Sequence, residues 1–220
     1  MMKENDKFKK IIEEKFNILS QHKIPDTWTD AFGKDMLDTI DMNLTMDLSA
    51  IIYRQKYIET YGFCLVAKDW INELSQIIGS GKCMEIMSGL GLITYALQEA
   101  GINCFATDDF SYKNNPAWFS GDPWVNTECI DAVEAVKKYG AKCDYIICSV
   151  PYMDNTAYLS LMAMREVNPK CKMIYIGEGS GGYTANDAFF RSMNTVDCLS
   201  DINILFRTFP FTHDFICMIN

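Results

Sequence analysis

Apolar and polar positions follow two patterns that alternate from residue 82 onward. Short, nearly continuous apolar runs are typical of strands buried on both faces, whereas apolar positions at helical spacing are typical of amphipathic helices. The runs predict strands at 83–87, 103–107, 145–149, 173–176, 202–206 and 214–219. The periodic segments predict helices at 92–100, 127–139, 156–166 and 185–194.

This alternation of strands and helices predicts an α/β fold with a parallel sheet covered on both faces. The last two predicted strands are separated by the short connection 208–211, which leaves no room for a crossover helix. We therefore expect them to pair antiparallel, as a terminal hairpin.

The first 60 residues are expected to form a helical extension or lid (1–60), followed by the main domain (61–220). Apolar residues at helical spacing predict an amphipathic helix over 3–20, and the segment around Pro25 ends it. The segment 35–61 is mixed and mainly helical in pattern, and 68–78 predicts another helix, stopped by two glycines. The first helix either packs on the main domain or binds a partner.

The composition predicts a cytoplasmic protein with a large core. Apolar residues make up 49% of the chain, yet no apolar run approaches the ~20 residues that span a bilayer, and the charged N-terminus is not typical of a secretory signal. The nine cysteines form no CxxC pair, which indicates reduced, buried thiols rather than disulfides. With only two histidines we expect no metal site. The oligomeric state stays open, with a homodimer among the options.

The net charge of −9 bears on the partners. Proteins that grip nucleic acid usually present a basic face, because neutralised phosphates supply much of the affinity. The only concentration of lysines, over 3–15, is interleaved with acidic residues. The charge therefore disfavours a nucleic-acid partner and favours a small-molecule or peptide one.

The most informative segment is a glycine turn between the first predicted strand and helix. It reads Glu85-Ile86-Met87-Ser88-Gly89-Leu90-Gly91, and Asp108 ends the next strand. Glycines let the backbone approach a ligand closely, and an acid at the end of the second strand is placed to meet a ribose diol. The segment predicts a nucleotide-type cofactor site at the carboxyl edge of the sheet.

The order acid-x-x-x-glycine-x-glycine resembles motif I of the class I S-adenosylmethionine (SAM)-dependent methyltransferases. Met87 stands where that pattern has its first glycine. The resemblance implies a Rossmann-like class I methyltransferase sheet, SAM as cofactor and S-adenosylhomocysteine as product.

The resemblance also implies which residues hold the cofactor. Glu85, Gly89 and Gly91, with Met87 and Ser88 between them, would cradle the amino acid end. Asp108, followed by Asp109, would bind the ribose hydroxyls. Tyr61 would cover the methionine end, and Trp118 or Trp124 would stack on the adenine. The alternative for these aromatic residues is a purely structural role in the hydrophobic core.

The segment Ser149-Val150-Pro151-Tyr152 follows the fourth predicted strand. It is similar to the N/D/S-P-P-Y/F motif of amino-methyltransferases, with Val150 in place of the first proline. There the polar residue and the next carbonyl accept hydrogen bonds from a planar NH2, and the aromatic ring stacks on it. The resemblance implies that Ser149, Pro151 and Tyr152 orient the acceptor; the alternative is a strand-end turn.

A glycine-rich loop at 177–182 follows the fifth predicted strand. Glu178 at its start is the candidate general base, and His213, which enters the last strand, is a second candidate for moving a proton. The alternative for Glu178 is that its loop only caps the next helix, with Thr184 as the N-cap. The alternative for His213 is a structural hydrogen bond. With the His213-Asp214 pair, this loop resembles a set of largely uncharacterised SAM-methyltransferase-like proteins.

These patterns predict a SAM-dependent methyltransferase acting on a nitrogen or oxygen nucleophile of a small-molecule or peptide acceptor. Two alternatives remain: a nucleic-acid amino-methyltransferase, suggested by the Ser149–Tyr152 motif, and a non-catalytic protein with the SAM-binding fold, suggested by Met87 and Val150.

Overall fold

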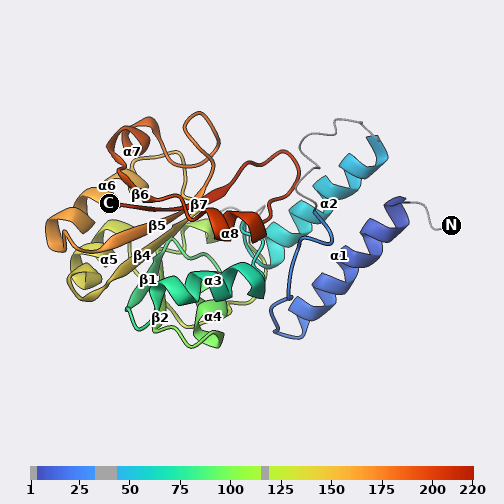
Figure 1. Ribbon diagram of the computed structural model, residues 1–220, viewed down its shortest axis with the longest axis horizontal. Helices are drawn as coiled ribbons and strands as arrows, with labels where there is room; N and C mark the ends of the chain where they lie inside the picture. Colours follow the sequence, from blue (N-terminus) through green and yellow to red (C-terminus); the bar gives the residue numbers. More distant parts are fainter. Residues whose placement is uncertain (1–3, 33–43, 115–118) are drawn as a thin grey trace.

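The computed structural model describes residues 4–32, 44–114 and 119–220. A seven-stranded sheet lies at the centre of this part of the chain, in the order β3-β2-β1-β4-β5-β7-β6 (Figure 1). The strands are β1 (Cys83–Ile86), β2 (Cys104–Asp108), β3 (Thr127–Cys129), β4 (Tyr145–Ser149), β5 (Lys172–Gly177), β6 (Thr195–Asp197) and β7 (Phe215–Ile219).

Neighbouring strands from β3 to β5 are parallel, and β7 runs antiparallel to both β5 and β6. The predicted α/β sheet, parallel with an antiparallel end and Rossmann-like in its strand order, is confirmed. Ile86 of β1 pairs with Cys148 of β4, so Met87, which follows β1, and Ser149, the last residue of β4, lie at the same edge of the sheet. The register thus brings the glycine turn and the Ser149–Tyr152 segment to one edge.

Helices cover both faces of the sheet (Figure 1). The described helices are α1 (Glu4–Ser20), α2 (Leu44–Thr60), α3 (Lys68–Ile78), α4 (Leu92–Glu99), α5 (Ala132–Tyr139), α6 (Thr156–Val167), α7 (Asp187–Ser192) and α8 (Ser200–Leu205), with short 3-10 turns η2 (Ser111–Asn114) and η3 (Gly140–Lys142).

Alternate strand residues enter two separate cores. Cys83 belongs to the core that includes α3, α4 and α8, whereas the adjacent Met84 belongs to the core that includes α5, α6 and α7. Successive side chains of a strand point to opposite faces, so the continuous apolar strands predicted from the sequence are needed to fill both cores.

The N-terminal helices α1 and α2 lie side by side at one end of the molecule (Figure 1). Apolar residues of α1, such as Ile12 and Leu19, are buried in the same core as α3 and α4. Trp28 donates its indole N–H to the carbonyl of Val66 at 2.9 Å. The first predicted helix is confirmed, and it packs against the rest of the chain. The part of the predicted segment 35–61 before α2 lies outside the described residues.

The strand predicted at 202–206 is wrong, because α8 occupies Ser200–Leu205. The buried side chains are Ile202 and Phe206, which are four residues apart as on a helix face, while Ile204 is 51% exposed. The outer partner of β7 is instead β6, whose three residues are all exposed and carry no apolar run. The predicted terminal hairpin is therefore replaced by the unit β6-α8-β7.

The helix predicted at 127–139 is wrong in its first part. Thr127 to Cys129 form β3, which pairs with the end of β2. Asp131 then caps α5, since its carboxylate accepts hydrogen bonds from the N–H groups of Val133 and Glu134. The helix predicted at 185–194 is shorter, and Asn186 rather than Thr184 is its N-cap.

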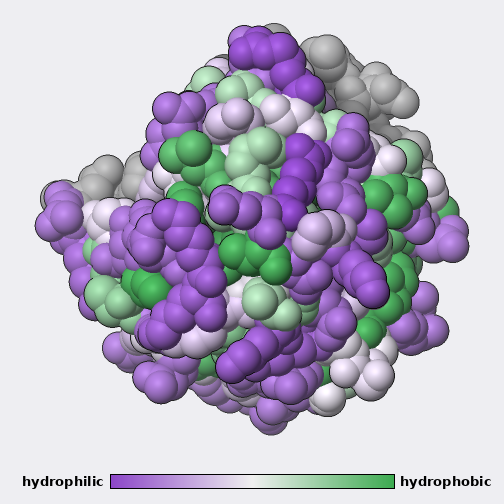
Figure 2. Space-filling view, turned by 90° about the vertical axis from the view of Figure 1, so that its left-hand side faces the viewer, coloured by the Kyte–Doolittle hydropathy of each residue, from purple (hydrophilic) through white to green (hydrophobic). Residues whose placement is uncertain are grey.

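The face at the end of the molecule opposite α1 and α2 is mainly hydrophilic, with hydrophobic residues scattered over it (Figure 2). In the part of the chain that the structure describes, no helix combines the length and apolar character that a membrane crossing requires. The cysteines are all free thiols, and only Cys129 and Cys198 are exposed.

Candidate functional site

Two adjoining cavities, of about 110 and 40 Å³, lie at the carboxyl ends of β1, β2 and β4. Ligands of open α/β sheets bind at this edge. The larger cavity reaches from the glycine turn to Asp108, Asp109 and Tyr152, and the smaller one reaches Tyr61, Glu85 and Ser88. Both are lined by the same six residues at their junction: Phe63, Met87, Gly89, Phe119, Ser149 and Val150.

The glycine turn has a left-handed backbone at Gly89 and Gly91, with φ of 55° and 77°. A Cβ atom at Gly91 would lie 2.5 Å from Cγ2 of Val125, so both space and φ require glycine there. Met87 has a φ of 53°, a conformation that methionine seldom adopts. The turn therefore keeps a left-handed backbone at the position where the resembling motif has glycine.

Asp108 ties the end of β2 to the glycine turn. Its Oδ2 accepts a hydrogen bond from the N–H of Gly89 at 2.8 Å, and its Oδ1 accepts one from the N–H of Phe110 at 2.7 Å. Burial raises the pKa of this carboxyl, and the two hydrogen bonds oppose that effect. Each oxygen has further lone pairs, so Asp108 can still accept hydrogen bonds from a diol in the larger cavity.

Glu85 is buried at the end of β1 and lines the smaller cavity. Its Oε2 accepts hydrogen bonds from Thr94 N–H at 3.0 Å and from Thr94 Oγ1 at 2.5 Å, near the start of α4. Burial raises its pKa to about 7, although the hydrogen bonds from Thr94 act in the opposite direction. A cationic group in the cavity would favour the carboxylate.

Ser88 provides a polar group without a partner. Its Oγ atom is inaccessible to solvent and has no hydrogen-bond partner among the described residues, although Ser88 lines the smaller cavity. Buried hydroxyl groups are normally hydrogen-bonded, so this atom could bind a ligand once the side chain turns toward the cavity. Tyr61 borders the same cavity and donates its hydroxyl to the carbonyl of Phe16 at 3.4 Å.

The segment after β4 lines both cavities. Val150 has a left-handed backbone with a φ of 45°, and its N–H donates to the carbonyl of Ile176 at 2.7 Å. The carbonyl of Pro151 accepts a hydrogen bond from Ala185 N–H. Burial, followed by the charges of Asp108 and Asp109, raises the pKa of Tyr152 to about 12. Tyr152 is therefore a neutral phenol beside the cavity.

Glu178 and His213 lie outside the residues that line the two cavities. The Glu178 carboxylate accepts hydrogen bonds from Tyr183 N–H at 2.6 Å and from His213 N–H at 3.0 Å. The His213 side chain is 69% exposed, with Nδ1 at 3.8 Å from Glu178 Oε1. This geometry fits a carboxylate that holds two loops together and gives no support to the predicted proton transfer.

Gly91 and Trp124 also lie outside the cavity linings. Trp124 is buried and stacks on His22, with ring centroids 4.1 Å apart. Its backbone N–H donates to the carbonyl of Leu90, so this residue is joined to the glycine turn through the main chain. Trp118, the other candidate for stacking on the adenine, lies outside the described residues.

Several residues that line the larger cavity were not predicted from the sequence, among them Tyr112, Phe119, Asp131 and Ala132. Asp131 and Ala132 follow β3, the strand that was read as part of a helix. A strand predicted at 127–129 would have pointed to both residues, because ligands of open α/β sheets bind at the carboxyl ends of strands. Phe119 comes from the long connection between β2 and β3, where no periodic pattern indicates a position.

No protein-family model matches the chain, and no curated protein matches it in sequence. Similar solved structures include the trans-methyltransferase CalH in complex with S-adenosylhomocysteine, TehB from Haemophilus influenzae, and magnesium protoporphyrin IX methyltransferase from Synechocystis with bound SAM. Their sequence identities are 20%, 13% and 13%, and their TM-scores are 0.34, 0.44 and 0.42. The alignments cover 53%, 76% and 96% of this chain and 37%, 65% and 96% of those chains.

The chain thus spans less than two thirds of the first two of these proteins. The similar structures include SAM-dependent methyltransferases. Likeness of this degree does not identify a substrate.

Proposed function

We propose that this protein is a SAM-dependent methyltransferase that modifies a nitrogen or oxygen nucleophile of a small-molecule or peptide acceptor. One observation carries the proposal. The glycine turn, Asp108 and the Ser149–Tyr152 segment line adjoining cavities at the carboxyl edge of the sheet. The elements proposed to hold the cofactor and the acceptor, Gly89 and Ser149 among them, therefore line one site.

The chemistry of the lining residues fits SAM. The unpaired Ser88 Oγ and the Glu85 carboxylate suit a charged amino acid end in the smaller cavity. Asp108, joined by Asp109 in the larger cavity, suits ribose hydroxyls. When bound, SAM would supply an electrophilic methyl group on a sulfonium.

Ser149 and Tyr152 are proposed to orient the acceptor, with Pro151 shaping the segment between them. Ser149 can accept a hydrogen bond from an N–H or O–H nucleophile, and the Tyr152 ring borders the same cavity. Their contribution is to hold the nucleophile in place, which is the main way in which an enzyme accelerates a direct transfer.

The charge of the site favours a small-molecule or peptide acceptor over nucleic acid. Asp108, Asp109, Asp131 and Asp154 line the larger cavity, and no lysine or arginine is among the described residues that line either cavity. Phosphate groups would be repelled there, whereas an acceptor with hydrogen-bond donors or positive charge would be favoured.

We further propose that residues 1–60 form a helical extension of the 61–220 domain that helps to close the site, and that the protein acts in the cytosol. In support, Tyr61 and Phe63 line the smaller cavity directly after α2. The free and mostly buried thiols suit a reducing compartment.

Calorimetric titration with SAM and S-adenosylhomocysteine tests the cofactor. We expect micromolar binding of both by the wild-type protein, and its loss in Asp108→Ala and Asp108→Asn. The control is Asp122→Asn, an exposed position outside the cavity linings. Wild-type affinity in both Asp108 variants would overturn the assignment of that residue.

Two further results would replace the proposal with one of the alternatives. If neither ligand binds to the wild-type protein, nor to a Phe119→Ala variant in which the junction of the two cavities is wider, the fold serves a non-catalytic role. A gel-shift assay with RNA and DNA that shows affinity falling steeply with salt would favour the nucleic-acid methyltransferase.

A further inference from the structure

The aromatic ring of Phe119 lies directly on the glycine turn. A Cβ atom added at Gly89 would be 2.9 Å from Cε2 and 3.3 Å from Cζ of Phe119. Both Gly89 and Phe119 border the two cavities. The ring therefore stands at the junction of the cavities, on the surface where the glycine leaves room for a ligand.

The divided site is too small for a molecule of the size of SAM. Ligand pockets commonly have volumes of about 300–1,000 Å³, whereas these cavities have about 110 and 40 Å³. In the proposed binding mode, the amino acid end of SAM contacts Glu85 and Ser88 in the smaller cavity, and its ribose contacts Asp108 in the larger one. The two ends belong to one covalent molecule. It must therefore cross the junction of the two cavities, which the Phe119 ring borders over Gly89.

Neighbouring aromatic rings hold Phe119 in this place. Its ring makes edge-to-face contacts with Tyr112 and Phe63, with centroids 4.9 and 5.3 Å apart. Such contacts are favourable and orient the ring, but they involve single side chains that can change rotamer. The half-buried Phe119 is thus held in place by contacts of its side chain, which a change of rotamer would break.

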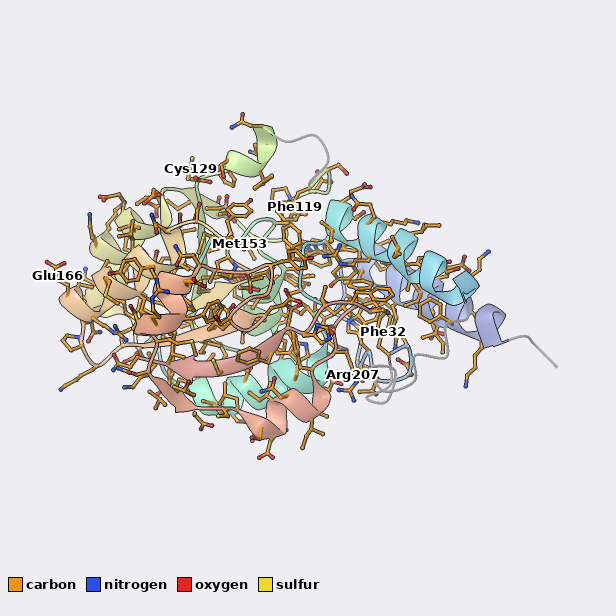
Figure 3. The ribbon with its side chains drawn as sticks, turned by 90° about the horizontal axis from the view of Figure 1, so that it is seen from above. Phe32, Phe119, Cys129, Met153, Glu166 and Arg207 are labelled. Atoms are coloured by element: carbon orange, nitrogen blue, oxygen red, sulfur yellow. The ribbon has the colours of Figure 1, made fainter. Side chains whose placement is uncertain are left out.

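The backbone next to Phe119 is fixed to the N-terminal helices. Ser120 and Gly121 both donate their N–H groups to the carbonyl of Glu59 in α2, at 2.6 and 3.1 Å. A Cβ atom at Gly121 would be 2.2 Å from the carbonyl oxygen of Thr60, so the two backbones are in tight contact. Figure 3 shows Phe119 between the edge of the sheet and α2. The ring can therefore turn about a fixed anchor.

We infer that Phe119 is a gate: its ring closes the cofactor site and must leave the face of Gly89 before the cofactor can bind. The inference rests on the proposed function. When only a fraction of the protein is in the form that can bind, the apparent dissociation constant is the intrinsic constant divided by that fraction. Removing the ring should therefore tighten binding and speed association.

The test is titration and stopped-flow binding of S-adenosylhomocysteine to the wild-type protein and to Phe119→Ala. We expect the variant to bind on the order of 10-fold more tightly, with the gain mainly in the association rate. Phe119→Leu keeps an apolar side chain if the alanine variant folds poorly, and it should show a smaller gain. The control is Phe211→Ala, since Phe211 is 62% exposed and lines neither cavity.

The outcomes separate the gate from the proposed function. Weaker binding to Phe119→Ala with faster dissociation would show that the ring is a wall of the filled site, which overturns the gate but leaves the methyltransferase proposal intact. Equal affinities and rates would also overturn the gate. No binding to any of the proteins would overturn both.

Discussion

The carboxylate of Glu178 accepts a hydrogen bond from the backbone N–H of His213 at 3.0 Å. Its other oxygen accepts one from the N–H of Tyr183 at 2.6 Å, so a single buried side chain joins the glycine-rich loop after β5 to the loop before β7. A carboxylate with both oxygens occupied by backbone donors holds loops in place, and the loop after β5 is joined to the site by the hydrogen bond from Ala185 N–H to the Pro151 carbonyl.

Glu178→Gln should therefore destabilise the fold more than it changes cofactor binding. The substituted amide can accept only one of the two hydrogen bonds and directs its NH2 toward the other N–H donor, with an expected loss of about 1–3 kcal/mol in the free energy of unfolding. Urea unfolding measures this loss, and calorimetry checks that the affinity for S-adenosylhomocysteine is unchanged.

The matched control is His213→Ala, which keeps the backbone N–H and removes only an exposed side chain. Its stability should remain close to that of the wild-type protein. If Glu178→Gln abolished methyl transfer at wild-type stability, the general-base role predicted from the sequence would be supported instead.

Met87 has a left-handed backbone, with a φ of 53°. A residue with a Cβ atom is disfavoured there by roughly 1–2 kcal/mol relative to glycine. We therefore expect Met87→Gly to be more stable than Met87→Ala by about 1 kcal/mol, since both variants lose the same side-chain packing. Thermal and urea unfolding of the two variants measure the difference.

The opposite order should hold at Asn72, an exposed position within α3. There Asn72→Ala should be more stable than Asn72→Gly by about 1 kcal/mol, as in ordinary helices. An alanine preference at both positions would show that the turn does not hold Met87 in the left-handed region.

Glu85 should make stability depend on pH. Burial raises its pKa from the usual 4.5 to about 7, so between these values the folded protein holds a proton that the unfolded chain releases. The free energy of unfolding should consequently fall as pH rises from about 4.5 to about 7, by on the order of 3 kcal/mol from this group alone. Asp214, whose pKa burial raises to about 6, acts in the same direction.

Glu85→Gln should remove the contribution of Glu85. Its stability relative to the wild-type protein should therefore improve between pH 5 and pH 8, as measured by urea unfolding at both values. A difference between the two proteins that is constant over this range would contradict the raised pKa.

Tyr57 should be essential for joining α2 to the main domain. Its buried hydroxyl donates to the carbonyl of Cys64 at 2.9 Å and accepts from Val66 N–H at 3.2 Å. Tyr57→Phe leaves both backbone groups without this partner in a buried region, so we expect a loss of about 2–4 kcal/mol in the free energy of unfolding.

Tyr53→Phe is the control for Tyr57→Phe, because the Tyr53 hydroxyl makes only a 3.4 Å contact with Glu13 at the surface. It should change stability by less than about 0.5 kcal/mol. Equal effects of the two substitutions would indicate that α2 is not held by the Tyr57 hydrogen bonds.

Much of the fold and part of the site were determined by the sequence itself. The strands β1, β2, β4, β5 and β7 follow from continuous apolar runs, because a strand buried on two faces needs an apolar residue at every position. The glycine turn, Asp108 and Ser149 could be placed at one edge because parallel strands bring their carboxyl ends together.

Other features depend on contacts between distant segments, which only the tertiary structure decides. Most of the run at 202–206 lies in α8, and it buries Ile202 and Phe206, which are four residues apart. The strand β6 forms from exposed residues because the edge of β7 is there to pair with. Glu178 found its partners 5 and 35 residues away, and Trp124 found His22 on the N-terminal segment. The spacing of apolar residues within a segment shows which of its faces is buried, but it does not show which other segment that face packs against. The partner of a carboxylate, or the glycine that an aromatic ring covers, is fixed only when the chain has folded and those segments meet.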